Sequence, residues 1–231
     1  MKQLVTKGIM LNRTNYGEAD RIITVLTTDQ GKIRLVAKGV RKIKSRLAGG
    51  IELFSINDIT YIQGKADLGT LISSRLIINF ENIVKDVDRT MYAYDVLKSV
   101  NKVTEDSPGP EYFDLLGACL QSINDHEVSL DMVRLWLHMK FLEFGGHTPN
   151  LISNQDGEPL DKNNKFTFSY DEMGFIDHSA GPFDARHVKL LRLAARARSP
   201  LQLKQVTGSA DLLPALVQLT RTMLTQHQQL L

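Results

Sequence analysis

The hairpin that decides the fold lies in residues 21–38, which read RIITVLTTDQGKIRLVAK. Residues 21–28 are rich in β-branched side chains, which favour strands. Residues 32–38 alternate, with Ile33, Leu35 and Ala37 on one face and mostly basic side chains on the other. This period-two pattern is typical of a strand with one buried face. Because Gly31 ends the short connection, the segment predicts a β-hairpin.

Further strands are expected around this hairpin. An opening strand is predicted over residues 4–11, and a second hairpin over 58–63 and 68–72, with its turn at 64–67. About five short strands at this spacing favour a small closed barrel, because closure removes the exposed edges of an open sheet.

Helical periodicity replaces the strand pattern after residue 80. Apolar residues recur at helical spacing over 113–123 and 130–144, and Gly145 with Gly146 is a plausible stop. An earlier helix is predicted from five apolar positions: Ile83, Val87, Met91, Tyr94 and Leu97.

The C-terminal part is expected to hold a polar insertion between helices. Residues 147–183 are turn-rich, with a small hairpin predicted at 165–170 and 174–176. Asp184 can cap a helix that runs to about Arg198. Ser199 is predicted to cap a further helical segment that begins with Pro200, before a final helix rich in leucine.

These elements together predict an α+β protein with two domains. The barrel is expected over residues 1–80 and a mostly α-helical domain over residues 81–231. The single cysteine, Cys119, cannot form an internal disulfide, and its apolar helical surroundings predict a buried, inert thiol. With no secretory signal and no run of about 18 apolar residues, we expect a cytoplasmic protein with no membrane partner.

The net charge of +2 conceals three blocks of opposite sign. Residues 1–80 carry a net charge of +7, residues 81–184 carry −11 and residues 185–231 carry +6. The basic blocks favour contact with a polyanion, whereas the acidic middle block would repel one.

The strongest local feature is the basic run KIRLVAKGVRKIKSR at residues 32–46. A phosphate backbone requires several cations on one surface, because affinity comes from counterion release. Gly39 would let the chain turn, so that residues 41–46 curl around a strand of nucleic acid. The alternative interpretation is a solvated basic face. Seven residues supply the charge: Lys32, Arg34, Lys38, Arg41, Lys42, Lys44 and Arg46.

Aromatic side chains, on which single-stranded bases stack, are scarce in the barrel. Tyr16 lies in a polar loop and is the best stacking candidate, whereas Phe54 and Phe80 are expected in the core or at a domain junction. The scarcity of aromatic side chains favours binding to the phosphate backbone without recognition of the base sequence.

A second basic cluster lies in the helix predicted after Asp184. Lys189, Arg192 and Arg196 follow helical spacing and would line one face. This face fits an acidic peptide, additional DNA surface or an ordinary solvated helix, and the sequence leaves the three open.

Common catalytic motifs are absent from the sequence, including the phosphate loop, HExxH and GxSxG. Asp86 and Asp88 would suit a metal-dependent nuclease, but two residues apart on a helix they point in different directions. The residues between 147 and 178 lack the paired cysteines of structural zinc sites, so no metal and no other cofactor is expected.

The segment GEADRIITVLTTDQGKIRLVAKGVRKIKSRLAGGIELFS resembles the RecO family of recombination mediators. The resemblance extends more loosely through the helical part, including Pro149-Asn150-Leu151 and Gly174-Phe175-Ile176. The matching positions of the N-terminal pattern are Gly17, Glu18, Asp20, Thr28, Gly31, Lys32, Ala37, Lys38, Gly39, Arg41, Ser45 and Phe54.

This resemblance implies a non-enzymatic, nucleoid-associated DNA repair protein with an OB-fold barrel. It implies binding of single- and double-stranded DNA, strand annealing and partnership with RecR. It also implies docking of the acidic C-terminal tail of the single-stranded-DNA-binding protein, so that RecA can be loaded. The DNA-contacting loop maps to Lys38, Arg41, Lys42, Lys44 and Arg46. Lys189, Arg192 and Arg134 are the candidates for tail binding.

Two features qualify the resemblance. The four-cysteine zinc site of many family members is missing from residues 147–183, which would leave stability there to packing. An RNA-binding OB-fold protein of translation would share the basic barrel and remains an alternative.

Overall fold

A computed structural model of the chain describes residues 2–45, 47–64, 68–104 and 109–227, with Ala48 described by its backbone alone. The chain divides into two compact units, Met1–His126 and Glu127–Leu231. Within these described ranges, no helix combines the length and the apolar composition needed to cross a membrane.

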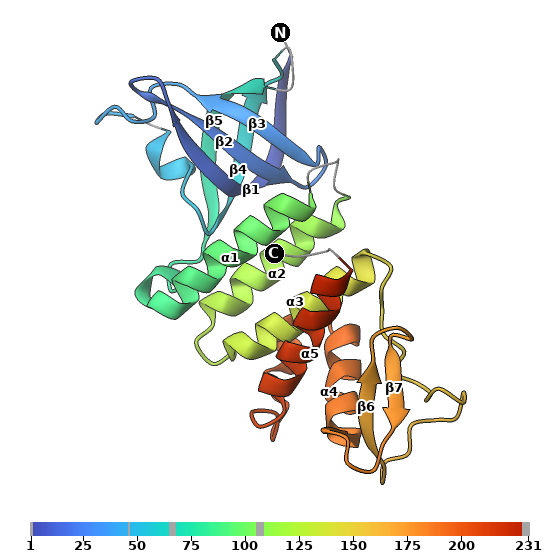
Figure 1. Cartoon of the computed structure of the whole chain (residues 1–231). Helices are drawn as coiled ribbons and strands as arrows, with labels where there is room; N and C mark the ends of the chain where they lie inside the picture. Colours follow the sequence, from blue (N-terminus) through green and yellow to red (C-terminus); the bar gives the residue numbers. More distant parts are fainter. Residues whose placement is uncertain (1, 46, 65–67, 105–108, 228–231) are drawn as a thin grey trace. The chain divides into compact units, whose positions relative to one another are not determined.

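The N-terminal strands close into a barrel, as the sequence predicted (Figure 1). Their spatial order is β1-β2-β3-β5-β4, and β4 pairs with β1 to complete the closure. The pairing of β3 with β5 is parallel, and the other pairs are antiparallel. This architecture agrees with the OB-type barrel that the resemblance implies. The strands are β1 (Gln3–Tyr16), β2 (Asp20–Thr27), β3 (Lys32–Ala37), β4 (Ser55–Ile62) and β5 (Leu68–Asn79).

The alternation in β3 places its side chains as predicted. Leu35 and Ala37 are buried in the barrel core, and Ile33 packs against that core from a partly buried position. Arg34 and, directly after the strand, Lys38 are exposed. Other strands and the segment after β3 complete the core with Met10, Ile23, Val25, Val40, Ile51, Ile59, Tyr61 and Leu71.

Two strands are longer than predicted, because β-bulges interrupt their period-two pattern. The register of β1 shifts between Met10 and Asn12, and that of β5 shifts twice against β4. Each bulge moves the following side chains to the opposite face. A run such as residues 71–79 (LISSRLIIN) therefore loses the alternation by which a strand is recognised. The turn predicted at 64–67 lies outside the described residues except for Gly64.

Helices α1 (Val87–Val103) and α2 (Glu111–Asn124) belong to the unit of the barrel, and both pack against β1 (Figure 1). The secondary structure changes from strands to helices near residue 80, and this compact unit continues through α2. A short 3-10 helix, η2 (Ile83–Lys85), precedes α1.

The apolar stripe predicted for the first helix is wrong in part. Ile83 and Leu97 are buried as expected, but three members of the stripe are exposed: Val87, Met91 and Tyr94. Arg89 takes a buried position instead. Its guanidinium donates to the carbonyl oxygens of Ile123 at 2.7 Å and His126 at 3.1 Å. These hydrogen bonds satisfy a charged group that is removed from water.

The second unit is built on α3 (Leu130–Phe144), which packs against both α4 (Ala185–Arg196) and α5 (Leu213–Gln226) (Figure 1). Gly145 ends α3, as predicted. The buried indole of Trp136 donates to the carbonyl oxygen of Ala197 at 2.9 Å. The predicted small hairpin is confirmed as β6 (Lys165–Ser169) and β7 (Gly174–Asp177), and β8 (Phe183–Asp184) pairs with the other side of β6.

The helix starts predicted at Asp184 and at Ser199 are both confirmed. Asp184 forms a capping box with His187, and the helix ends at Arg196. Ser199 is the N-cap of the next helical segment, as predicted, although its side chain forms no capping hydrogen bond. Pro200 begins this segment, which is a short 3-10 helix, η3 (Pro200–Leu203).

The polar insertion is held by a hydrogen-bond network as well as by packing. The buried Asn154 donates from Nδ2 to Oδ2 of Asp177 at 2.8 Å. Its Oδ1 accepts from the backbone N–H groups of Asp156 at 3.0 Å and Glu158 at 2.9 Å. Asn164 donates to the other carboxylate oxygen of Asp177 at 2.8 Å. The expectation that packing alone stabilises this segment is therefore incomplete.

Candidate nucleic-acid interface

The outer face of β3 presents two basic side chains with different surroundings. Arg34 is exposed to solvent. Lys32 is partly buried, and its Nζ donates to the carbonyl oxygen of Asn101 near the C-terminal end of α1, at 2.8 Å. A cation at this end of a helix also interacts favourably with the helix dipole. The structure therefore places Lys32 against α1 and Arg34 toward water.

The basic loop after β3 is braced by the loop that joins β1 to β2. The backbone N–H of Gly39 donates to Oδ1 of Asp20 at 2.7 Å. The backbone N–H of Arg41 donates to the carbonyl oxygen of Ala19 at 2.9 Å, and its Nη1 donates to that of Gly17 at 3.3 Å. Gly39 has a φ of +63°, a conformation that glycine adopts without steric cost. Four positions of the pattern quoted above take part in these contacts: Gly17, Asp20, Gly39 and Arg41.

The same loop has internal order and displays its cations outward. The backbone N–H of Lys42 donates to Gly39 at 3.1 Å, and that of Ser45 donates to Lys42 at 3.0 Å. Val40 is buried and anchors the base of the loop in the barrel core. The side chains that follow it are exposed: Arg41, Lys42, Ile43 and Lys44. We call residues 38–45 the basic loop.

Four cations of this surface have no ion-pair partner in the described part of the chain. Among described residues, no carboxylate lies within ion-pair distance of Arg34, Lys38, Lys42 or Lys44. Elsewhere in the barrel, Arg13 pairs with Glu52 at 2.7 Å and Arg75 with Asp58 at 2.6 Å. Arg46, also expected at the interface, lies outside the described residues.

Tyr16 lies at the same end of the barrel as the basic loop. It is the last residue of β1, it is exposed, and the next residue, Gly17, accepts the hydrogen bond from Arg41. Phe54 and Phe80 are buried, as predicted. The structure therefore leaves the Tyr16 ring accessible to solvent beside the basic loop.

The three residues expected to bind an acidic tail lie in the second unit and have separate surroundings. Nε of Arg192 donates to the carbonyl oxygen of Leu151 at 2.7 Å, which ties α4 to the polar insertion. Arg134 forms an ion pair with Asp131 at 2.7 Å. Lys189 is exposed on α4 and lines a hollow.

The hollow beside Lys189 combines cations with an apolar wall. It has a volume of about 170 Å³. Arg186 also lines it, but forms ion pairs with Asp184 at 3.2 Å and Asp211 at 3.3 Å. The rest of the lining comes from Leu190, Leu193, Val206, Thr207, Gly208, Ser209 and Leu212. Sequence reasoning missed the 206–212 segment, although Thr207-Gly208-Ser209 is a recognisable turn signal.

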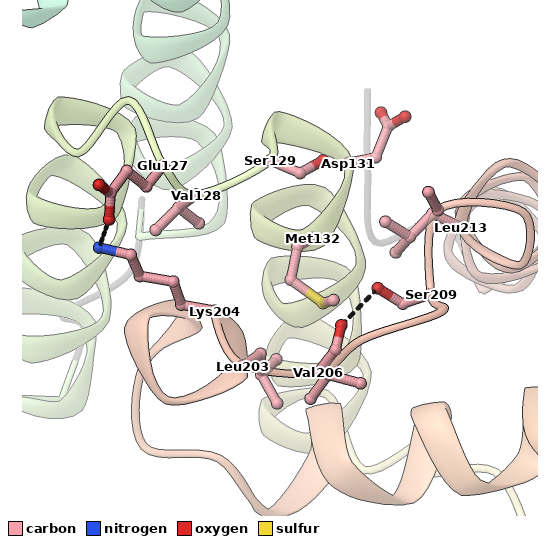
Figure 2. Close-up of a pocket in the computed structure, with 11 residues that line it drawn as sticks. Glu127, Val128, Ser129, Asp131, Met132, Leu203, Lys204, Val206, Ser209 and Leu213 are labelled. Carbon is pink, nitrogen blue, oxygen red and sulfur yellow. Dashed lines mark hydrogen bonds and ion pairs between the residues drawn. The ribbon is translucent and has the colours of Figure 1, made fainter.

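A second hollow, of about 240 Å³, lies on α3 and shares Val206 and Ser209 with the first. Figure 2 shows Val128, Met132 and Leu203 around its apolar interior. Glu127 and Lys204 form an ion pair at its rim (Figure 2). With Asp131 also in the lining, this rim carries more acidic than basic side chains, so the hollow suits an anionic tail less well than the one at Lys189.

Other reactive groups have structural roles. Asp86 is the N-cap of α1 and accepts a hydrogen bond from the backbone N–H of Arg89 at 3.0 Å, so it does not form a carboxylate pair with Asp88. Cys119 is fully buried, and burial raises the pKa of its thiol. No group of three or more His, Cys, Asp or Glu in the described ranges is arranged to hold a metal ion.

A small closed barrel with an unneutralised basic loop, joined to a helical region, defines an OB-type protein whose surface is complementary to nucleic acid. Comparison of the sequence with models of known protein families identifies the family within this class. The family described as "Recombination protein O N terminal" matches residues 1–80, and "Recombination protein O C terminal" matches residues 84–230. The chain belongs to the RecO family, which places it in DNA repair and recombination.

Similar proteins from several bacteria support the same conclusion. The DNA repair protein RecO of Alkaliphilus metalliredigens is 31% identical over 202 residues, which are 87% of this chain and 81% of the relative. RecO of Bacillus pumilus is 32% identical over 83% of this chain and 73% of the relative. RecO of Listeria monocytogenes serotype 4b is 33% identical over 81% of this chain and 75% of the relative.

Proposed function

We propose that the chain binds single- and double-stranded DNA through the basic loop and the outer face of β3, and that it anneals complementary strands. One observation carries this proposal: a braced loop displays cations that have no ion-pair partner among the described residues. Two DNA strands repel through their phosphates, and a basic surface that holds them loosely lowers this repulsion. Base pairing then completes the reaction, and no covalent bond is formed or broken.

Charge reversal of Arg41, Lys42 and Lys44 to Glu tests this proposal. With about four phosphate contacts to single-stranded DNA, the plot of log affinity against log salt should have a slope of about −3. The triple variant should lose DNA binding and annealing while its circular dichroism and melting temperature stay unchanged. DNA affinity equal to that of the unmodified protein would refute the proposal.

A matched control separates a local site from an effect of net charge. Lys85, Lys98 and Lys102 are exposed on η2 and α1 of the same unit, so their reversal to Glu changes the net charge by the same amount. This variant should keep most of its DNA affinity. RNA of the same sequence serves as a competitor, and preferential RNA binding would favour the translation alternative.

We also propose that the hollow beside Lys189 binds the acidic C-terminal tail of the single-stranded-DNA-binding protein. A tail of this kind ends in an apolar side chain and a carboxylate, and a cation beside leucine side chains is its physical complement. Lys189→Glu should weaken binding of a tail peptide by about tenfold, as expected for one charge-assisted contact, and leave DNA affinity unchanged. Equal loss of both would make α4 additional DNA surface.

We further propose that the chain acts with RecR to load RecA onto DNA coated by the single-stranded-DNA-binding protein. Family membership supports this role. Size-exclusion chromatography with RecR tests the complex, and the onset of RecA-catalysed ATP hydrolysis on coated DNA tests loading. Loading that proceeds equally well without this chain would contradict the proposal.

A further inference from the structure

The tip of the basic loop carries an apolar side chain that charge neutralisation does not explain. Ile43 has a relative exposure of 104%, the highest among the described large apolar residues. Solvent exposure of a β-branched apolar side chain is unfavourable, and a surface loop gains nothing from it in the free protein. Ile43 lies between Lys42 and Lys44, within the surface that is proposed to bind phosphates.

The backbone holds Ile43 at the outermost point of the loop. The hydrogen bond from Ser45 N–H to the carbonyl oxygen of Lys42, at 3.0 Å, closes a four-residue turn with Ile43 and Lys44 at its central positions. The buried Val40 and the hydrogen bond from Gly39 to Asp20 fix the base of the loop. A β-branched side chain is also stiff at χ1. Ile43 is thus an exposed apolar side chain on a hydrogen-bonded turn between two cations.

We propose that Ile43 inserts between neighbouring bases of bound single-stranded DNA while Lys42 and Lys44 hold the flanking phosphates. In proteins that bind the minor groove of duplex DNA, apolar side chains insert between base steps and partly unstack them. Tyr16 is an exposed aromatic residue at this end of the barrel, and aromatic side chains are otherwise scarce there. The side chain of Ile43 would therefore add an apolar contact with the bases. Unstacked bases expose their pairing edges, which links the wedge to annealing. This inference rests on the proposed function and assigns the base-contacting residue within it.

Val87 provides a matched control in the same unit. Its relative exposure is 78%, and its neighbours are Asp86 and Asp88 instead of lysines. It is therefore an exposed apolar residue that a DNA strand should avoid. Substitution of either residue removes few contacts within the protein, so both sets of variants should fold, which a thermal melt verifies.

The first experiment measures base stacking directly with a single-stranded oligonucleotide that contains 2-aminopurine, whose fluorescence rises on unstacking. The unmodified protein and Ile43→Leu should raise the fluorescence. Ile43→Ser should abolish the rise and weaken binding by roughly fivefold, with an unchanged salt slope, because the phosphate contacts remain. Val87→Ser should behave like the unmodified protein. An Ile43→Ser variant that unstacks bases normally would overturn the inference.

The second experiment uses a tryptophan reporter. The only native tryptophan, Trp136, is buried, so Ile43→Trp adds one exposed indole to a constant background. Single-stranded DNA should quench the new fluorescence in Ile43→Trp and leave Val87→Trp unaffected. Bound DNA without quenching would overturn the inference, as would a blue shift with anionic phosphatidylglycerol vesicles and none with DNA. Failure of the proposed function itself would differ, because the triple charge-reversed variant would then still bind DNA.

Discussion

The basic loop and helix α4 have similar numbers of cations in the sequence but differ in how many the structure leaves available. In the basic loop, Lys38, Lys42 and Lys44 are exposed, without an ion-pair partner among the described residues. On α4, Arg186 pairs with two carboxylates and Arg192 donates to a backbone carbonyl. The number of basic residues in a sequence segment sets an upper limit on the cations that can bind an anion. The intramolecular partners of those residues in the fold decide how many cations stay available to a ligand.

The largest effect is expected when two charges are reversed in each region. Lys42→Glu with Lys44→Glu should reduce affinity for single-stranded DNA by roughly 30-fold and make the salt slope shallower by about 1.4. Lys189→Glu with Arg196→Glu should change affinity for single-stranded DNA by less than about threefold, since we propose a peptide as the ligand beside Lys189. Fluorescence anisotropy over a salt series measures both, and equal losses would remove the distinction between the two regions.

The next largest effect on DNA affinity is expected when the hydrogen bond between Asp20 and the basic loop is removed. Asp20→Ala removes the acceptor for Gly39 N–H and should lower DNA affinity by about tenfold, because the cations lose their fixed arrangement. Asp20→Asn retains an acceptor oxygen and should lower it far less. The Asp20→Ala protein should also unfold more easily, by about 1–2 kcal/mol. If both variants bind DNA normally, the order of the loop is irrelevant to binding.

A smaller effect, on stability alone, is expected for the structural cation of α4. Arg192→Ala removes the hydrogen bond to Leu151 and should lower the free energy of unfolding by about 1 kcal/mol. Arg196→Ala, at an exposed position on the same helix, serves as the control and should change it little. Urea denaturation measures both values. If the Arg192→Ala variant is as stable as the unmodified protein, Arg192 is again a candidate for ligand binding.

The smallest effect should depend on pH. Burial, together with Arg134 and Arg221, lowers the pKa of His138 from 6.5 to about 4, and His138 shares a 2.9 Å hydrogen bond with Thr220. Since the unfolded chain binds this proton more tightly, the contribution is complete above pH 6.5 and is lost as the pH falls toward 4. Between about pH 7 and pH 5.5 the loss is about 1 kcal/mol, so the melting temperature should drop by about 2–4 °C over this interval. His138→Gln should flatten that part of the profile, and an unaltered profile would assign the loss to other groups.

The barrel could be predicted from the sequence because β3 and its hairpin obey a local rule. Leu35 and Ala37 alternate with Arg34, Val36 and Lys38, and the fold buries Leu35 and Ala37 while it exposes the two cations. The ends of β1 and β5 could not be predicted in the same way, because bulges reverse the alternation within each strand. Such bulges depend on strand pairing, which a local pattern does not contain.

The site could be predicted as a set of cations, but not as an arrangement. Nothing local indicates that Lys32 contacts the end of α1, or that Asp20 holds Gly39, because both contacts join segments distant in sequence. The face of α1 was misassigned for a related reason. Arg89 satisfies its charge with distant carbonyl oxygens, so a polar residue occupies a buried position while Met91 is exposed.

The hydrogen bonds that join the two loops at the end of the barrel have a kinetic consequence. A surface that already has its bound shape spends little ordering free energy on contact, so diffusional encounter, steered by charge, should set the association rate. Residence time then depends on the ionic atmosphere, which tightens or loosens every phosphate contact together. Such a surface can release one strand and capture another quickly, which fits the proposed annealing of complementary strands.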